Sequence, residues 1–230
     1  MEFAALPPLT FKILRYLAGI AVAAYCLRQV RKPSKWLGRF FVGMMNMSHS
    51  RLTDWGLGHV QIPEDFIILD VGCGGGRTIE KLAALAVNGK VYGVDYAQGS
   101  VAASRSHNAD LIKDGRVEIQ HASVSKLPFP DNRFDLVTAV ETQYYWPDLV
   151  NDMQEIRRVL KSGGTLIVIA ETYKGGAYSK LQRPVMKLVG SSYLSVADHR
   201  ELFAKAGYQD IQTFEEKNKG WFCGMGKKAS

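Results

Sequence analysis

Cysteine is scarce in this 230-residue sequence, where only Cys26, Cys73 and Cys223 occur, at scattered positions. They form no C-x-x-C pair, and no cysteine–histidine spacing matches a zinc site. The scarcity excludes a disulfide scaffold and predicts a chain that folds in a reducing cytosol without a bound metal. With 47% hydrophobic and 22% charged residues, the composition is that of an ordinary globular domain and excludes a disordered tail.

Long hydrophobic runs are missing as well. The apolar stretch near the N-terminus, from Tyr16 to Leu27, lies between Arg15 and Arg28. It is short for a membrane-spanning helix, which needs about 20 apolar residues. Three interpretations of residues 9–30 stay open: a helix packed on the fold, an interfacial membrane anchor, and a removed or spanning segment.

Acidic residues are nearly absent from the first 60 positions, which hold eight Lys or Arg but only Glu2 and Asp54. This segment carries +6 of the formal +7, and residues 61–230 carry +1. After Pro33 an apolar stripe recurs at helical spacing, formed by Trp36, Leu37, Phe40, Phe41, Met44 and Met45. The stripe either packs on the core or lies against a lipid surface or an apolar substrate. Residues 9–45 are therefore a candidate membrane contact.

Neither an internal repeat nor a low-complexity segment is present, and from residue 64 onward short apolar runs alternate with helical patterns. Strands are predicted at 66–71, 90–94, 117–121, 134–140, 165–170, 209–214 and 221–225. Helices are predicted near 76–86, 98–112, 148–161 and 196–206. The alternation predicts an α/β fold with a Rossmann-like, doubly wound, mainly parallel seven-stranded sheet. Its last two strands follow each other without a helix, which predicts an antiparallel terminal hairpin.

A glycine-rich loop, residues 72–76, follows the first predicted strand and precedes a helix. Glycines let the backbone approach a ligand, and the helix N-terminus offers free N–H groups. The dinucleotide fingerprint G-x-G-x-x-G fails at Arg77, which disfavours a nicotinamide oxidoreductase. The spacing is instead D-x-G-x-G-x-G, beginning at Asp70. Asp95, at the tip of the second strand, either accepts the ribose hydroxyls of a nucleoside or caps the following helix.

Four longer stretches stand in a fixed order along the chain: LDVGCGGG, YGVDYAQGSV, LPFPDNRFDLVTAVET and EIRRVLKSGGTLIVIAE. They are similar to the first motif, the second motif, the fourth-strand region and the helix–Gly-Gly–strand unit of one family. The chain thus resembles the class I S-adenosylmethionine-dependent methyltransferases over about residues 64–228. The resemblance implies S-adenosylmethionine as the cofactor and S-adenosylhomocysteine as its product.

The resemblance also implies which residues contact the cofactor. The glycine loop would line its methionine part, Asp95 would hold the ribose and Tyr96 would flank the adenine. Many members carry Gly-Asp-Ala before Leu-Pro-Phe, whereas residues 122–124 here are Ala-Ser-Val, so a neutral hydroxyl replaces a carboxylate near the adenine amine. Cys73 would contribute its backbone while its thiol packs. The implied set is Asp70, Gly72, Cys73, Gly74, Asp95, Tyr96, Ser123, Val124 and Glu141.

Residues 141–147, ETQYYWP, follow the fourth strand, at the sheet edge where the methyl acceptor would bind. They lack the [N/D]-P-P-[F/Y/W] motif of family members that methylate amino groups of nucleobases or glutamine, which disfavours those acceptors. Glu141 either holds the methionine end of the cofactor or acts as a base. The aromatic side chains at 144–146 either form a wall that favours a flat or apolar acceptor or pack the next helix.

The segment MSHSRLTDW, residues 47–55, resembles the M-S-x-G-x-H-R-L-W segment of the ubiquinone/menaquinone-biosynthesis C-methyltransferases, with one residue fewer before the arginine. In such enzymes N-terminal helices close over the cofactor. The resemblance leaves His49 as a base, an acceptor contact or a cap histidine. Glu171 is a further pocket carboxylate, and residues 172–195 are predicted to form a lid. The candidate catalytic residues are therefore His49, Tyr144 and Glu171.

The sequence thus predicts an N-terminal helical cap or membrane-associating segment, residues 1–60, and a cofactor-binding methyltransferase domain, residues 61–230. We expect in-line methyl transfer to a small apolar or aromatic acceptor. The predicted setting is cytoplasmic, with peripheral membrane attachment as one interpretation. Two alternatives remain: an RNA methyltransferase that uses the basic segment, although its large aliphatic residues disfavour nucleic acid, and a non-catalytic cofactor-binding protein. The pattern does not indicate an oligomeric state.

Overall fold

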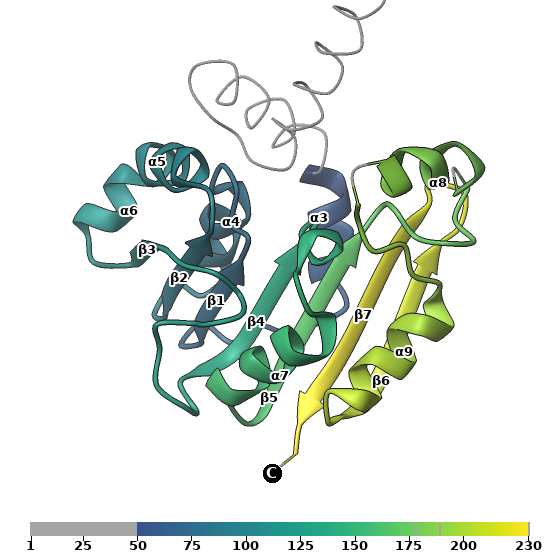
Figure 1. Ribbon diagram of the computed structural model, residues 1–230. Helices are drawn as coiled ribbons and strands as arrows, with labels where there is room; N and C mark the ends of the chain where they lie inside the picture. The colour runs from purple at the N-terminus through teal and green to yellow at the C-terminus, as the bar shows by residue number, and fades with distance from the viewer. Residues whose placement is uncertain (1–49, 178, 189, 230) are drawn as a thin grey trace, which may run out of the picture.

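Seven strands of the described residues form one sheet in the computed structural model, which describes residues 50–177, 179–188 and 190–229 (Figure 1). Their order across the sheet is β3-β2-β1-β4-β5-β7-β6, and β7 runs antiparallel to both of its neighbours while the other pairs are parallel. The strands are β1 (Ile67–Val71), β2 (Lys90–Asp95), β3 (Val117–His121), β4 (Phe134–Val140), β5 (Leu160–Ala170), β6 (Tyr208–Glu216) and β7 (Trp221–Lys228). The predicted mainly parallel sheet with its antiparallel terminal hairpin is confirmed.

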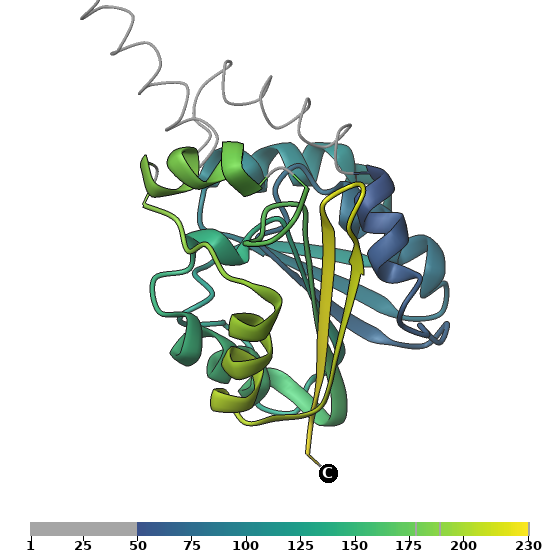
Figure 2. The same ribbon diagram turned by 90° about the vertical axis from the view of Figure 1, so that its right-hand side faces the viewer.

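Helices cover both faces of the sheet (Figure 2). They are α3 (Ser50–Leu57), α4 (Arg77–Leu85), α5 (Gln98–His107), α6 (Ala109–Lys113), α7 (Leu149–Val159), α8 (Ser179–Leu188) and α9 (Val196–Lys205), with a 3₁₀ turn, η1, at Gln143–Tyr145. One apolar cluster joins the sheet to α3, α4 and α5, and another joins it to α7 and α9. The doubly wound arrangement predicted from the alternating pattern is therefore present.

The central strands are apolar on both faces because each face is covered. In β1, Ile68 packs with the α3–α4–α5 cluster, whereas its neighbour Leu69 packs with the α7–α9 cluster, and both are fully buried. Successive side chains of a strand point to opposite faces, so a strand buried on both sides needs a continuous apolar run. Such runs are what made the strands predictable, and at their carboxyl ends they stop at polar residues.

The structure departs from the predicted elements at places that long-range contacts determine. Strand β5 begins at Leu160 rather than at residue 165, because Leu160 already pairs with Phe134. The helix predicted at 98–112 is interrupted at Asn108, whose buried side-chain amide donates to the carbonyl oxygens of Gly76 and Ser104, each at 3.0 Å. Helices α3 and α8 were not predicted, and α8 contains Pro184 in its interior.

Several expectations fall on residues that the structure does not describe. The segment 9–30, the helix expected after Pro33 and His49 lie outside the described residues. Of the predicted N-terminal cap, the described part is residues 50–60, which includes α3. Among the described residues, none of the helices combines the length and the apolar character that crossing a membrane requires.

Candidate functional site

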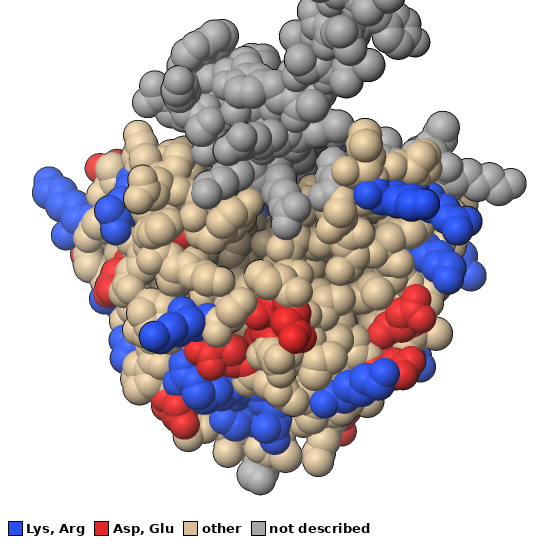
Figure 3. All heavy atoms as spheres, viewed as in Figure 1, with Lys and Arg blue, Asp and Glu red and all other residues tan. Residues whose placement is uncertain are grey.

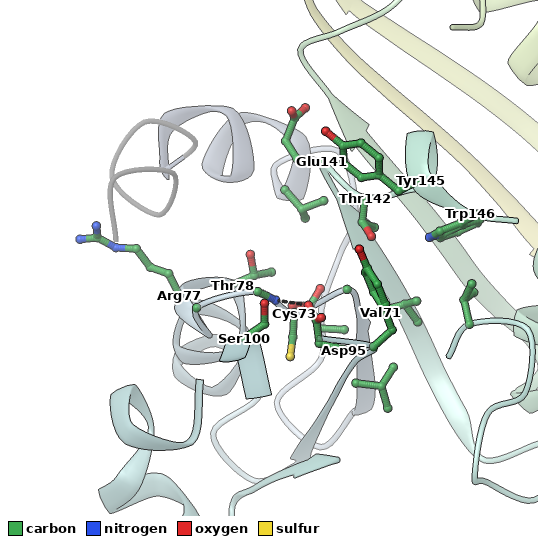
Figure 4. A pocket seen from close by; sticks show the side chains of 18 of the residues that line it. Val71, Cys73, Arg77, Thr78, Asp95, Ser100, Glu141, Thr142, Tyr145 and Trp146 are labelled. Carbon is green, nitrogen blue, oxygen red and sulfur yellow. Dashed lines mark hydrogen bonds between the residues drawn. The ribbon is translucent and has the colours of Figure 1, made fainter. Parts of the chain in front are cut away.

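A cavity of about 370 Å³ lies where β1, β2 and β4 end, at the carboxyl edge of the parallel part of the sheet. Its walls come from the loops that follow these three strands and β3, from the beginnings of α4 and α5, and from α3 (Figure 4). Because the strand order reverses direction between β1 and β4, the loops after these strands diverge and leave room for a ligand. The fold thus places the glycine loop and the aromatic segment after β4 around one space.

The glycine loop after β1 is held against β2 by its backbone and lies close to Thr142, which follows β4. The N–H groups of Gly72 and Cys73 both donate to the carbonyl oxygen of Val94, at 2.8 and 3.0 Å. Gly72 has φ 74°, and a Cβ there would lie 2.1 Å from the hydroxyl oxygen of Thr142. Any side chain would therefore separate the loops after β1 and β4, so this position requires glycine.

Asp95, the last residue of β2, also holds the glycine loop in place, through hydrogen bonds to its carboxylate. One oxygen accepts the N–H of Gly74 at 3.0 Å (Figure 4), and the other accepts the N–H of Ala97 at 2.8 Å. The residue is buried and still lines the cavity. Burial raises the pKa of Asp95, and the two backbone hydrogen bonds oppose that rise. A carboxylate can accept about four hydrogen bonds, so Asp95 keeps capacity for donors of a ligand.

Asp70, in β1, is the most strongly desolvated acid of the cavity wall. One of its oxygens accepts a 2.6 Å hydrogen bond from the Thr138 hydroxyl on β4. Burial raises the pKa of Asp70 to about 7; the hydrogen bond from Thr138 lowers it, and the nearby charge of Asp95 raises it further. Near neutral pH this carboxyl therefore sits close to its titration midpoint, and a cation bound beside it would favour the ionised form.

Glu141 follows β4 and adopts φ 56°, a left-handed conformation that is uncommon outside glycine. One of its carboxylate oxygens accepts the Tyr144 hydroxyl at 2.7 Å and the N–H of Glu171 at 2.5 Å. Glu141 lines the cavity, and Figure 4 shows its side chain at the rim, above Thr142 and Tyr145. These contacts hold the carboxylate in a fixed place, which suits binding more than proton transfer.

The aromatic segment after β4 divides between the cavity and the core. Tyr145 and Trp146 line the cavity, whereas Tyr144 is buried in a cluster with Tyr173 and Phe222. The 3₁₀ turn η1 produces this division by directing consecutive side chains to different sides. Tyr145 and Trp146 line the cavity, as an aromatic wall requires, while Trp146 also packs in the core cluster with α7, as the alternative of helix packing predicts.

The structure brings all nine residues of the implied cofactor set to the cavity wall: Asp70, Gly72, Cys73, Gly74, Asp95, Tyr96, Ser123, Val124 and Glu141. Of the candidate catalytic residues, Tyr144 and Glu171 are not among those that line the cavity, and His49 lies outside the described residues. The roles of all these residues stay predictions. Burial raises the pKa of the Cys73 thiol well above its ordinary value, so the thiol is held neutral.

Several lining residues were missed by sequence reasoning. Ser50 and Thr53 reach the cavity from α3, and Thr78 and Lys81 reach it from α4. Lys81 also forms an ion pair with Asp54, which joins α4 to α3. No local pattern marks these residues, because their place depends on how α3 docks beside the glycine loop. Among the described residues, no cluster of three or more His, Cys, Asp or Glu could hold a metal ion.

Comparisons with known proteins agree with this geometry. A family model described as a methyltransferase domain matches residues 69–168. The 27-O-demethylrifamycin SV methyltransferase of Amycolatopsis mediterranei is 34% identical over 119 residues, which are 51% of this chain and 43% of that protein. The demethylmenaquinone methyltransferase of Oceanobacillus iheyensis is 27% identical over 185 residues, covering 70% of this chain and 77% of that protein. The chain thus spans less than half the length of the first of these two relatives.

A solved structure supports the fold assignment. The S-adenosylmethionine-dependent methyltransferase from Aquifex aeolicus superposes with a TM-score of 0.68 at 21% identity, covering 83% of this chain and 98% of that chain. At this level of identity the likeness concerns the fold alone. The family model, the strand order and the glycine loop agree on one assignment: residues 69–168 are a methyltransferase domain of the class I, S-adenosylmethionine-dependent type.

Proposed function

We propose that this protein transfers the methyl group of S-adenosylmethionine to a small, apolar or aromatic acceptor. One observation carries the proposal: the glycine loop, the Asp95 carboxylate and the pair Tyr145–Trp146 line the same cavity. The first two are suited to a nucleoside with a charged amino-acid tail, and the third to a flat or apolar molecule. The names of two relatives give small molecules as acceptors, 27-O-demethylrifamycin SV and demethylmenaquinone.

The side of the cavity formed by the glycine loop, Asp95 and Glu141, which we call the polar half, fits the cofactor. Asp95 would accept hydrogen bonds from the ribose hydroxyls, Tyr96 and residues 122–124 would flank the adenine, and Glu141 with the glycine loop would hold the methionine end. The fit rests on the loop geometry, because Gly72 leaves no room for a side chain and so keeps the backbone at the cavity wall. When bound, S-adenosylmethionine supplies an electrophilic methyl group on a positively charged sulfur.

The side formed by Tyr145 and Trp146, which we call the apolar half, would align the acceptor and exclude water. The partly exposed ring of Tyr145 offers a surface on which an acceptor ring can stack, and Trp146, which is 7% exposed, supports that wall from the core. Aromatic faces also attract a sulfonium charge. Holding the nucleophile in line with the methyl group is the main requirement of this displacement, and a base is needed only for an acceptor that arrives protonated at its attacking atom. We therefore assign these aromatic residues to acceptor positioning.

The first prediction concerns the acceptor class. Full-length protein incubated with S-adenosylmethionine labelled in the methyl group, and with a cell extract, is expected to label the lipid or small-molecule fraction. Separate extraction of the lipid, small-molecule and RNA fractions, followed by scintillation counting, gives the result. Label in RNA alone would favour the alternative of an RNA methyltransferase. Binding of the cofactor without label in any fraction would favour the non-catalytic alternative.

The second prediction tests the ribose contact. Asp95→Ala removes the acceptor for two backbone N–H groups and for the ribose, so affinity for S-adenosylhomocysteine is expected to fall at least about tenfold. Asp95→Asn keeps one acceptor oxygen, so its affinity should lie between those of the wild type and Asp95→Ala. Asp110→Asn, on an exposed side of α6, is the matched control and should bind as the wild type does. Isothermal calorimetry gives the affinities of the wild type and the three variants, and an unchanged value for Asp95→Ala would refute the ribose assignment.

The third prediction uses the pKa of Asp70, which burial raises to about 7. Below that pH the carboxyl is protonated, and a bound cation must displace the proton, so binding of S-adenosylmethionine should tighten as pH rises toward 7 and then level off. Calorimetry between pH 5.5 and 8 measures this dependence. In Asp70→Asn the side chain is neutral at every pH. The affinity of this variant for S-adenosylmethionine should therefore not tighten as the pH rises toward 7. An identical pH profile in both proteins would contradict the role of Asp70.

We also propose that the acceptor is delivered from an anionic membrane surface. Outside residues 1–60, the positive charge gathers in residues 172–195, which hold four Lys or Arg and no Asp or Glu. Of these, Lys174, Arg183 and Lys187 are exposed, and Figure 3 shows blue side chains at the position of α8. Leu188, at the end of α8, is 73% exposed. An exposed apolar residue among cations is the pattern of a helix that contacts anionic lipid.

The fourth prediction tests this surface. Full-length protein should sediment with vesicles that contain phosphatidylserine and much less with neutral phosphatidylcholine vesicles. The double substitution Arg183→Glu/Lys187→Glu should weaken the binding more than about tenfold, because each basic residue near such a surface contributes about 1 kcal/mol. The control is Arg200→Glu/Lys205→Glu, two exposed positions on α9. Equal binding by the α8 and α9 variants would exclude α8 as a membrane contact.

A further inference from the structure

Tyr144 contacts both ends of the segment that leaves β5 and returns to α9. We define the α8 segment as residues 171–194. At its beginning, the N–H of Thr172 donates to the Tyr144 hydroxyl at 3.3 Å. Near its end, the N–H of Ser192 donates to the Tyr144 carbonyl oxygen at 2.9 Å. A single buried residue thus holds the α8 segment at two points that are twenty positions apart in the sequence.

The same tyrosine also holds a residue of the cavity wall. Its hydroxyl donates to the Glu141 carboxylate at 2.7 Å, and that carboxylate oxygen also accepts the N–H of Glu171, the first residue of the α8 segment. A continuous chain of hydrogen bonds therefore runs from the cavity, through Glu141 and Tyr144, to Thr172. Because Tyr144 is only 5% exposed, water cannot readily take over its hydrogen bonds.

The position of Glu141 depends on these contacts. A non-glycine residue with φ 56° is held in a sparsely populated conformation, and such conformations persist where the surroundings determine them. Tyr144 and the N–H of Glu171 fix the carboxylate from two sides. Burial raises the pKa of the Tyr144 hydroxyl well above its ordinary value, so the group stays a neutral donor toward Glu141.

We propose that Tyr144 is a positioning residue that couples occupancy of the cofactor cavity to the order of the α8 segment. The proposal rests on the proposed function, because it takes Glu141 as a contact of the cofactor. A ligand that engages the Glu141 carboxylate fixes it further, and the fixed carboxylate holds Tyr144 and, through it, both ends of the α8 segment. Coupling of this kind is reciprocal, so order in the α8 segment tightens cofactor binding by the same factor.

Hydrogen–deuterium exchange read by mass spectrometry tests the proposal, with S-adenosylhomocysteine as the probe at a concentration that calorimetry shows to be saturating. In the wild type, the probe should slow exchange both in the glycine loop, residues 72–76, and in the α8 segment. In Tyr144→Phe, which keeps the ring and removes the hydroxyl, the probe should still protect the glycine loop, whereas its protection of the α8 segment should fall well below that in the wild type, because only the bond from Glu171 to Glu141 and the backbone bond from Ser192 remain. Its affinity for the probe should fall about tenfold.

Tyr193→Phe is the matched control. The Tyr193 hydroxyl donates to the carbonyl oxygen of Ser179 within the α8 segment, at 3.0 Å, and Tyr193 is not among the residues that line the cavity. Its loss should speed exchange in the free protein while the probe still protects the α8 segment. A merely structural role of Tyr144 would give the same result as this control, so the two variants separate the interpretations.

The possible failures are distinguishable. If the wild type does not bind the probe, the proposed function fails. If the wild type binds the probe and protects the glycine loop, but exchange in the α8 segment is unchanged, the coupling fails while the proposed function stands. That wild-type result decides the question even if Tyr144→Phe does not fold. If Tyr144→Phe folds and the probe protects its α8 segment as fully as that of the wild type, the assignment to Tyr144 is overturned.

Discussion

The hydrogen bonds that tie the glycine loop to the end of β2 are the constraint on which the site depends. The carbonyl oxygen of Val94 accepts hydrogen bonds from the N–H groups of Gly72 and Cys73, and the Asp95 carboxylate accepts one from the N–H of Gly74. These bonds fix where the loop backbone lies and where α4 begins. Because β1 and β2 are adjacent and parallel, they also bring Asp70 and Asp95 to the same edge of the sheet, where burial raises the pKa of both carboxyls. A cationic ligand offsets that cost of buried negative charge.

The other half of the site depends on how the chain turns after β4. A left-handed Glu141 and the short turn η1 send Tyr145 toward the cavity and Tyr144 into the core. One turn therefore supplies both a cavity wall and a contact with the α8 segment. This arrangement explains why a stretch of three consecutive aromatic residues serves different purposes, which its composition alone does not distinguish. Loops at the carboxyl edge carry these functions because the sheet beneath them is rigid.

The predictable parts of the fold are those that local patterns encode. Apolar runs marked the strands, the spacing from Asp70 to Gly76 marked the glycine loop, and the family resemblance implied the cofactor residues. The features that were missed depend on contacts between distant segments. Asn108 interrupts its helix to reach Gly76, Leu160 extends β5 by pairing with Phe134, and α3 brings Thr53 to the cavity. The catalytic assignment of Tyr144 rested on its position after a strand, and spacing alone could not show that its hydroxyl is bonded to Glu141.

We propose above all that the cavity at the ends of β1, β2 and β4 holds S-adenosylmethionine, with the ribose at Asp95. A crystal structure of the full-length protein with S-adenosylhomocysteine tests this claim most directly. We expect the ribose hydroxyls within hydrogen-bond distance of the Asp95 carboxylate, the adenine beside Tyr96 and the amino-acid end between the glycine loop and Glu141. A nucleoside bound elsewhere, or a ribose without contact to Asp95, would contradict the account.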